Sequence, residues 1–370
     1  MTDHLFSPLE IRGTTVRNRV AVSPMCQYSC DRDGLATDWH EVHLGSRATG
    51  GAGVVMTEAT AVEPRGRITP HDLGIWSDEH ADALAPIAEF VAERGATPGI
   101  QLAHAGRKAS KTRPWEGSRP IRPDDGGWET IAPSADPYPY GEASDADDVE
   151  PAATRKMDRD DIEAVTESFV AAAERALDAG FEIAEVHAAH GYLLHEFLSP
   201  VTNSRDDEYG GDFEGRTRLV REVVEAVREV WPGDQPVFVR VSASDWLPDR
   251  ESWTVEDTAR LAPLLAEAGA DLIDVSSGGI HPAQQIPQTG PNYQVRYAER
   301  VGEATDALVG AVGGITEPAQ ADALVRNDRA DLAIVGREHL RDPYFALHAA
   351  AELGMEDEVE WPVQYRRAAP

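Results

Sequence analysis

The chain has 370 residues, of which 41% are hydrophobic, and a formal net charge of −31 at pH 7. This length suits one α/β barrel domain. No uncharged apolar run is long enough to span a membrane. The negative charge argues against nucleic acid and anionic membranes as partners, because both would be repelled.

The acidic residues are scattered along the whole chain, which favours a solvated surface adapted to high salt over an acidic tail that binds a partner. The N-terminus has no basic region followed by an apolar run, so no signal peptide is expected. Two cysteines, Cys26 and Cys30, are too few for a disulfide framework. We therefore expect a cytoplasmic protein, from an organism that lives at high salt.

In chain order, residues 5–19 predict a short β-hairpin that turns near Gly13 and plugs the N-terminal end of a barrel. Amphipathic helices are expected between apolar runs, as over 158–179, which stops at Gly180. Similar helices end at Gly95 and Gly269. The runs themselves predict eight strands, at 20–25, 53–60, 98–104, 182–188, 237–242, 272–276, 307–312 and 332–335.

Strands that look apolar on both faces and alternate with helices are typical of a parallel sheet covered on all sides. Eight such units predict a closed (β/α)₈ TIM barrel, a single α/β domain over residues 1–370. An open doubly wound sheet is the alternative, but no Gly-x-Gly-x-x-Gly follows the first strand.

A long segment at 109–153 interrupts the pattern after the third strand and is rich in Pro, Gly, Asp and Trp. Loops of this length in compact domains are usually functional or disordered. We interpret its first part as a flap over the active site and its acidic stretch, 141–150, as a solvated tip.

The C-terminal ends of barrel strands carry the catalytic groups. At the fourth end stand His187 and His190, with Tyr192 beyond them. They offer two hydrogen-bond donors and a phenol to a polar substrate. A His-x-x-His pair without a clear third ligand is weak support for zinc, so no metal is expected. Buried structural histidines are the other alternative.

Glycines follow the seventh and eighth strands, at Gly313-Gly314 and at Gly336, and Arg337 comes next. Together they predict a phosphate site, although glycine also serves simply to turn the chain. Arg240 lies within a buried run and needs an anionic partner, either a structural carboxylate or a cofactor that becomes negative during turnover. Gln101 is placed to hydrogen-bond a heterocycle.

Taken together, the motifs resemble the old yellow enzyme family of FMN-dependent ene-reductases, most closely the thermophilic-like subgroup that includes xenobiotic reductases. The resemblance covers nearly the whole chain. It rests on the strings LFSPLEIRGTTVRNRVAVSPMCQYS, GRITPHDLGIWSDEH, GIQLAHAGRK, EVHAAHGYLLHEFLSPVTNSRDDEYGG, FVRVSASD and VGREHLRDPYF. The larger dienoyl reductases that share the barrel add an iron–sulfur site, for which this chain lacks the cysteines. Shorter relatives lack much of the 109–153 segment.

The resemblance implies a non-covalent FMN across the barrel mouth, with NADPH or NADH as the reductant. The flavin would be held by residues at six strand ends, namely Ser23, Pro24, Met25, Cys26, Ala59, Gln101, Arg240, Gly313, Gly314, Gly336 and Arg337. Cys26 would line the flavin ring rather than attack the substrate, and Arg240 would face the ring edge where negative charge gathers on reduction.

The implied reaction is the reduction of activated C=C bonds in α,β-unsaturated carbonyl or nitro compounds. Hydride passes from reduced FMN to the β-carbon of the alkene. His187 and His190 stabilise the substrate oxygen, and Tyr192 protonates the α-carbon as a general acid. Tyr28 adds a hydrogen bond to the substrate.

The C-terminal tail, 361–370, resembles that of the subgroup, in which an arginine enters the active site of a neighbouring subunit. Arg367 is the candidate, with Arg366 next to it, and a frayed, solvated terminus is the alternative. This implies a homodimer or homotetramer. Two other functions stay open: a non-redox barrel, an aldolase or isomerase acting on a phosphorylated substrate, and an FMN-binding protein without turnover.

Overall fold

The computed structural model describes residues 3–140, 153–287 and 289–369. Eight parallel strands close into a barrel in the order β3-β4-β5-β8-β9-β10-β11-β12. Their bounds are β3 Val20–Val22, β4 Val54–Ala61, β5 Thr97–Ala103, β8 Ile183–Ala188, β9 Val237–Ser242, β10 Leu272–Ser276, β11 Leu308–Val312 and β12 Leu332–Val335. Each predicted strand is present, and closure of the barrel confirms the (β/α)₈ fold over an open sheet.

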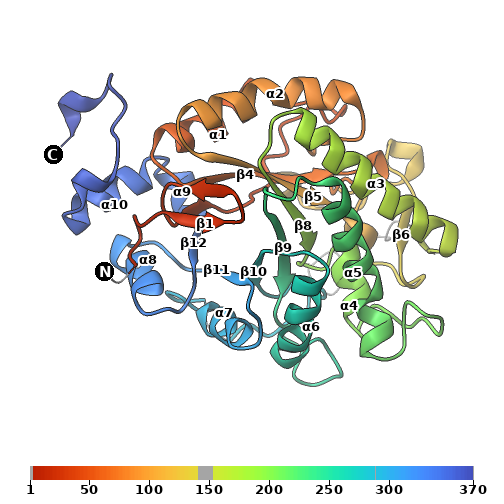
Figure 1. Cartoon of the computed structure of the whole chain (residues 1–370). Helices are drawn as coiled ribbons and strands as arrows, with labels where there is room; N and C mark the ends of the chain where they lie inside the picture. The colour runs from red at the N-terminus through yellow and green to blue at the C-terminus, as the bar shows by residue number, and fades with distance from the viewer. Residues whose placement is uncertain (1–2, 141–152, 288, 370) are drawn as a thin grey trace.

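Helices form a ring around the strands (Figure 1). They are α1 Asp38–Thr49, α2 Asp78–Glu93, α3 Arg159–Asp178, α4 Leu193–Leu198, α5 Phe213–Val230, α6 Val255–Glu267, α7 Val295–Gly302, α8 Pro318–Arg326, α9 Arg337–Arg341 and α10 Phe345–Leu353. Helix α3 shows how the sequence sets such bounds. The Asp158 side chain caps its first turn by accepting from the Asp161 N–H, and Gly180 follows its end with a φ of +90°.

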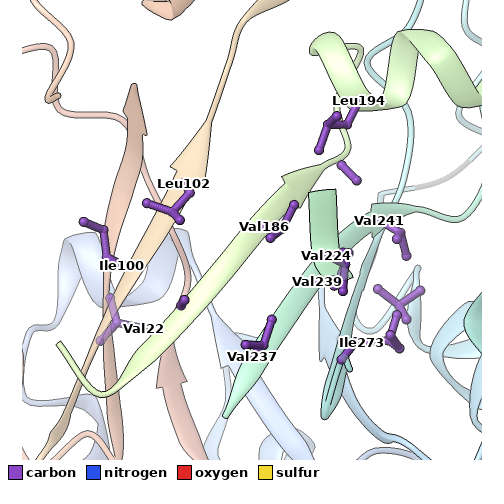
Figure 2. Packing of buried hydrophobic residues seen from close by; sticks show 14 of the residues in the cluster. Val22, Ile100, Leu102, Val186, Leu194, Val224, Val237, Val239, Val241 and Ile273 are labelled. Atoms are coloured by element: carbon purple, nitrogen blue, oxygen red, sulfur yellow. The ribbon is translucent and has the colours of Figure 1, made fainter. Parts of the chain in front are cut away.

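The main hydrophobic core lies between the barrel and its helices. Alternate residues of each strand point outward into it, as Val237, Val239 and Val241 do on β9. Figure 2 shows Val224 of α5 beside Val239, and Ile273 of β10 is the strand-register partner of Val239. This layer accounts for the apolar, β-branched runs from which the strands were predicted.

The inner face of the barrel has a second, smaller core at its N-terminal end. The hairpin β1 (Leu9–Ile11) and β2 (Thr14–Val16) is antiparallel, as predicted. Its side chains Leu9, Ile11 and Val16 pack against inward-facing residues such as Phe238 and Leu272. The hairpin therefore plugs this end of the barrel.

Above the plug, the expectation of strands that are apolar on both faces is wrong. The inward-facing positions there are polar and fully or almost fully buried: Gln101, Glu185, Arg240 and Asp274. Strand register brings them together, because Gln101 pairs with Glu185 and Arg240 pairs with Asp274. Apolar neighbours on either side conceal this polar layer in the sequence.

The 109–153 segment contains short 3-10 turns at Pro114–Glu116 and Pro123–Asp125. Strand β6 (Thr130–Ala132) then pairs in parallel with β7 (Thr154–Lys156). The expected acidic tip lies outside the described residues. At the other end of the chain, the segment after α10 runs out from the body of the molecule (Figure 1). No helix in the described ranges is long and apolar enough to cross a membrane.

Candidate functional site

The structure brings His187, His190 and Tyr192 together at the C-terminal end of β8, as the sequence predicted. His187 Nε2 lies 3.4 Å from His190 Nδ1, and the two rings meet edge to face. The Tyr192 ring lies 5.2 Å from the His187 ring, centroid to centroid. Two imidazoles and a phenol thus converge on one point of the catalytic face.

Burial fixes the protonation of these three side chains. Desolvation, and then the positive charge of Arg240, lower the pKa of both histidines well below the usual range. Desolvation likewise raises the pKa of Tyr192 well above its usual value. At neutral pH each imidazole is therefore neutral with a single N–H, and the phenol keeps its proton.

Ser276, at the end of β10, contacts His190 on the side of the ring away from His187. Its Oγ lies 2.8 Å from His190 Nε2. When the hydroxyl donates to Nε2, the imidazole proton occupies Nδ1, which faces His187. His187 Nδ1 is buried without a partner among the described residues, and with its proton on Nε2 the His187 ring would donate toward the same point as His190. A ligand oxygen beside this pair would then receive two N–H bonds.

A lysine that sequence reasoning missed holds the turn that carries these groups. His190 has a φ of +59°, a left-handed conformation that a non-glycine residue adopts only with support. Lys108 Nζ donates to the His190 carbonyl at 2.7 Å and to the Gly279 carbonyl at 2.9 Å. The same ammonium lies 4.9 Å from the centre of the Tyr192 ring.

A second buried contact fixes the other side of the turn. The Gly191 N–H donates to His195 Nδ1 at 2.8 Å, which leaves Nε2 of that ring to carry the proton. This Nε2 lies 3.0 Å from Asp245 Oδ1, and neither side chain is exposed to solvent. Helix α4, on which His195 lies, is in this way tied to the catalytic turn.

The segment after β3, Ser23 to Cys26, borders the same face. Arg240 Nη2 donates to Ser23 Oγ at 3.1 Å. The Gln27 N–H donates to Glu58 Oε1 at 3.0 Å and so anchors the segment to β4. Burial raises the pKa of Cys26, which keeps a neutral thiol and favours a lining role over a nucleophilic one.

Three other predicted residues lie around this segment. Ala59, at an irregularity of β4, lines a small hollow together with Tyr192. Tyr28 has a φ of +52°, and its ring meets Trp115 edge to face at 5.9 Å. Trp115 belongs to the segment expected to act as a flap, so this contact brings that segment over the catalytic face.

A cavity of about 400 Å³ unites the predicted phosphate residues. Gly313, Gly314, Gly336 and Arg337 all line it, and so does Met25 from the segment after β3. Gly313 and Gly314 have φ values of +116° and +68°, which other residues rarely adopt. A Cβ added to Gly336 would lie in ordinary van der Waals contact with Ser23 Cβ at 3.8 Å, so close packing of protein atoms is not what requires glycine here.

Arg240 has the structural partner that the sequence left as one of two alternatives. Its Nε lies 3.0 Å from Asp274 Oδ2 inside the barrel. On the adjoining strands β5 and β8, Gln101 Nε2 donates to Glu185 Oε2 at 2.6 Å. Asp274 and Glu185 are thus members of the site that sequence reasoning missed. The alternation of inward and outward positions along each strand would have found them.

Arg367 does not lie in the active site of its own chain. The tail borders a groove lined by Arg17, Gly51 and Gly95, which precede barrel strands and mark the end opposite the catalytic face. Arg366 lines this groove, and Arg367 is exposed beside it. Among the described residues, no group of three or more His, Cys, Asp or Glu side chains is arranged to hold a metal ion.

The sequence matches the NADH:flavin oxidoreductase / NADH oxidase family over residues 4–356. The chain belongs to this family. It is 48% identical to an NADPH dehydrogenase of Geobacillus sp. (strain WCH70) over 368 residues, 99% of each chain. It is 45% identical to an NADPH dehydrogenase of Bacillus subtilis (strain 168) with the same coverage. Morphinone reductase in complex with tetrahydroNAD superposes with a TM-score of 0.76 at 27% identity, over 95% of this chain and 91% of that one.

Family membership confirms the resemblance to old yellow enzymes and the cofactors it implied, FMN with NADH or NADPH as reductant. The residues present fit FMN. The cavity lined by Gly336 and by the cation of Arg337 suits its phosphate, and the buried guanidinium of Arg240 suits a ring that gains negative charge. Membership also argues against a non-redox aldolase or isomerase.

Proposed function

We propose that the protein reduces the C=C bond of electron-poor alkenes, namely α,β-unsaturated carbonyl or nitro compounds. The observation that carries this proposal is the pair of neutral imidazoles whose facing nitrogens are 3.4 Å apart, with a protonated phenol beside them. Two N–H donors suit an oxygen that gains negative charge during reaction. A phenol with a raised pKa suits a proton donor.

Bound FMN, once reduced by NADPH or NADH, supplies the hydride for the β-carbon. The chain's own residues do the rest. His187 donates from Nε2 and His190 from Nδ1 to the carbonyl or nitro oxygen, and Ser276 holds the His190 proton on Nδ1. Tyr192 gives its phenolic proton to the α-carbon. Tyr28 adds a hydrogen bond to the substrate, and Trp115 packs on Tyr28 as part of the flap.

The double variant His187→Ala, His190→Ala tests the oxygen clamp. It should bind FMN with its normal flavin absorbance yet lose most turnover of cyclohexenone, since one lost oxyanion donor costs about 10²–10³ in rate. Tyr192→Phe is the matched control, because it removes the proton donor and leaves the clamp intact. An unchanged kcat/KM in the double variant would refute the oxyanion role.

Shared active sites are the second part of the proposal. Since Arg367 lies outside its own site, it is free to enter that of a neighbouring subunit in a homodimer or homotetramer, with Arg366 as the alternative. Deleting residues 364–370 should then raise the KM for the substrate and leave FMN content unchanged. Kinetics identical to those of the full chain would argue against an arginine supplied in trans.

We further assign the protein to a cytoplasm of high salt content. Its net charge of −31 and its two unpaired cysteines support this assignment. The melting temperature should rise with KCl, whereas a melting temperature independent of salt would count against it.

A further inference from the structure

The polar layer inside the barrel holds more ionisable groups than the proposed reaction uses. Glu185, Arg240 and Asp274 face inward from the neighbouring strands β8, β9 and β10. Their exposed fractions are 1%, 4% and 0%. Gln101 of β5 completes the layer through its bond to Glu185. The proposed reaction uses Gln101 and Arg240 but gives the two carboxyl groups no task.

The charges in this layer do not balance. Two carboxyl groups share one guanidinium, so full ionisation would bury an uncompensated negative charge, which is costly. Arg240 is the only cation among the described residues that acts on these two carboxyl groups, whose pKa values its charge lowers. The neighbouring His187 and His190 are neutral, and the cations Lys108 and Arg337 act on the two histidines and on Tyr293 instead. A proton held on one of the two carboxyl groups removes this excess negative charge.

The geometry shows where a proton fits. Asp274 Oδ2 is 3.0 Å from Arg240 Nε, yet both Asp274 oxygens accept no hydrogen bond of good geometry within the described residues. Glu185 Oε2, by contrast, already accepts from Gln101. Burial raises the pKa of Glu185 to about 8 and that of Asp274 to about 6. Burial therefore favours the proton on Glu185, and Asp274, which faces Arg240, as the anion of the pair.

We propose that Asp274, backed by Glu185, is a proton acceptor beneath the flavin site and makes the reduction potential of bound FMN depend more steeply on pH than reduction of the flavin alone requires. This inference rests on the FMN-dependent reaction proposed above and on the FMN site that the family implies, in which Arg240 would face the edge of the flavin ring. NADPH gives a hydride, with its electron pair, to FMN and leaves as NADP⁺. The added negative charge then competes with Asp274 for Arg240. A proton from solvent binds an Asp274 oxygen, and the guanidinium pairs with the reduced flavin.

The test is the midpoint potential of bound FMN, measured by anaerobic spectroelectrochemistry from pH 6 to 9. In a two-electron couple each proton taken up shifts the potential by about 30 mV per pH unit. On reduction the wild type takes up one proton at the flavin and one at Asp274. Its slope between pH 6 and 8 should therefore be about 60 mV per pH unit. Asp274→Asn should halve that slope and raise the potential at pH 8.

Glu185→Gln and Asp322→Asn are the comparisons. Glu185 already holds its proton at pH 7, so Glu185→Gln should alter the potential only above about pH 8. Asp322, a buried carboxylate on α8 that pairs with Arg326, lies outside this layer, and its variant should keep the wild-type slope. If Asp274→Asn fails to fold, the wild-type slope and the Glu185→Gln profile still decide.

A wild-type slope of about 30 mV throughout, or an Asp274→Asn slope equal to the wild type, would overturn the inference. Its failure is separate from failure of the proposed function, because the potential is measured without any alkene. If the histidine double variant keeps its turnover while the slope is halved in Asp274→Asn, the clamp is wrong and the proton acceptor stands.

Discussion

Replacing Lys108 with Met tests how the catalytic turn is held. Met keeps an unbranched apolar stem of similar length but removes the ammonium, and with it the bonds to the carbonyls of His190 and Gly279. Both carbonyls lie next to a left-handed backbone conformation, at His190 itself and at Gly279. The variant therefore removes the donor that spans the two loops without changing any side chain that is proposed to contact the substrate.

The expected magnitudes follow from those two bonds. A buried acceptor that loses its donor costs about 1–3 kcal/mol. This cost is partly offset, because the variant no longer has to bury the charge of Lys108. Burial lowers the pKa of Lys108 to about 7, which shows that burying this charge is unfavourable. We expect a net destabilisation of about 1–3 kcal/mol. With about 2.1 cal/mol/K of unfolding entropy per residue, that lowers the melting temperature of the 370-residue chain by about 1–4 °C.

The kinetic effect should be similar in free energy to the effect on stability. A displaced His190 weakens one of two donors, so the rate of alkene reduction by the reduced enzyme should fall about tenfold, or about 1.4 kcal/mol. Stopped-flow reoxidation of the flavin by cyclohexenone measures this rate. Lys111→Met is the matched control, since Lys111 is a neighbouring buried lysine in the same segment. Equal effects in both variants, or an unchanged rate in Lys108→Met, would refute this role for Lys108.

Three further predictions follow from the same site and surface. His195→Ala should lower kcat for alkene reduction severalfold at constant FMN affinity, because the Gly191 N–H loses its acceptor; titration with FMN separates the two effects. Apoprotein should lose stability as the pH rises from 5 to 8, because Glu185 keeps its proton up to about pH 8 when folded and releases it near 4.5 when unfolded. Glu185→Gln should lose less over this interval in urea unfolding. Raising KCl from about 0.1 to 1 M shortens the Debye length from about 10 to 3 Å, and the melting temperature should rise by several degrees.

The strand ends were predictable because the outward side chains of barrel strands are apolar and form a run that is visible in the sequence. Val237, Val239 and Val241 are outward and apolar, and a run of such residues locates β9 from the sequence alone. The groups that follow each run then fall on the catalytic face by the rules of the fold. This reasoning placed His187, His190 and the glycine cavity correctly.

The supporting residues were harder to find because their signals are local while their partners are distant. Asp274 is one polar residue in an apolar strand, and its meaning depends on Arg240, which the register of β9 and β10 brings opposite. In the sequence Lys108 looks like an ordinary surface lysine. Its role in holding the turn depends on the carbonyls of His190 and Gly279, which two other loops bring to it. The tail is a further case, since the role proposed for Arg367 lies outside its own chain.

The hairpin at the N-terminal end gives the barrel the shape of a cup with one open rim. Leu9, Ile11 and Val16 seal the bottom against Phe238 and Leu272. Cofactor, reductant and substrate would all enter through this rim, so a molecule bound nearest the rim would block the exit of one bound deeper. A tightly bound substrate analogue should therefore slow the release of FMN, and the flavin should exchange fastest in enzyme with no other ligand bound.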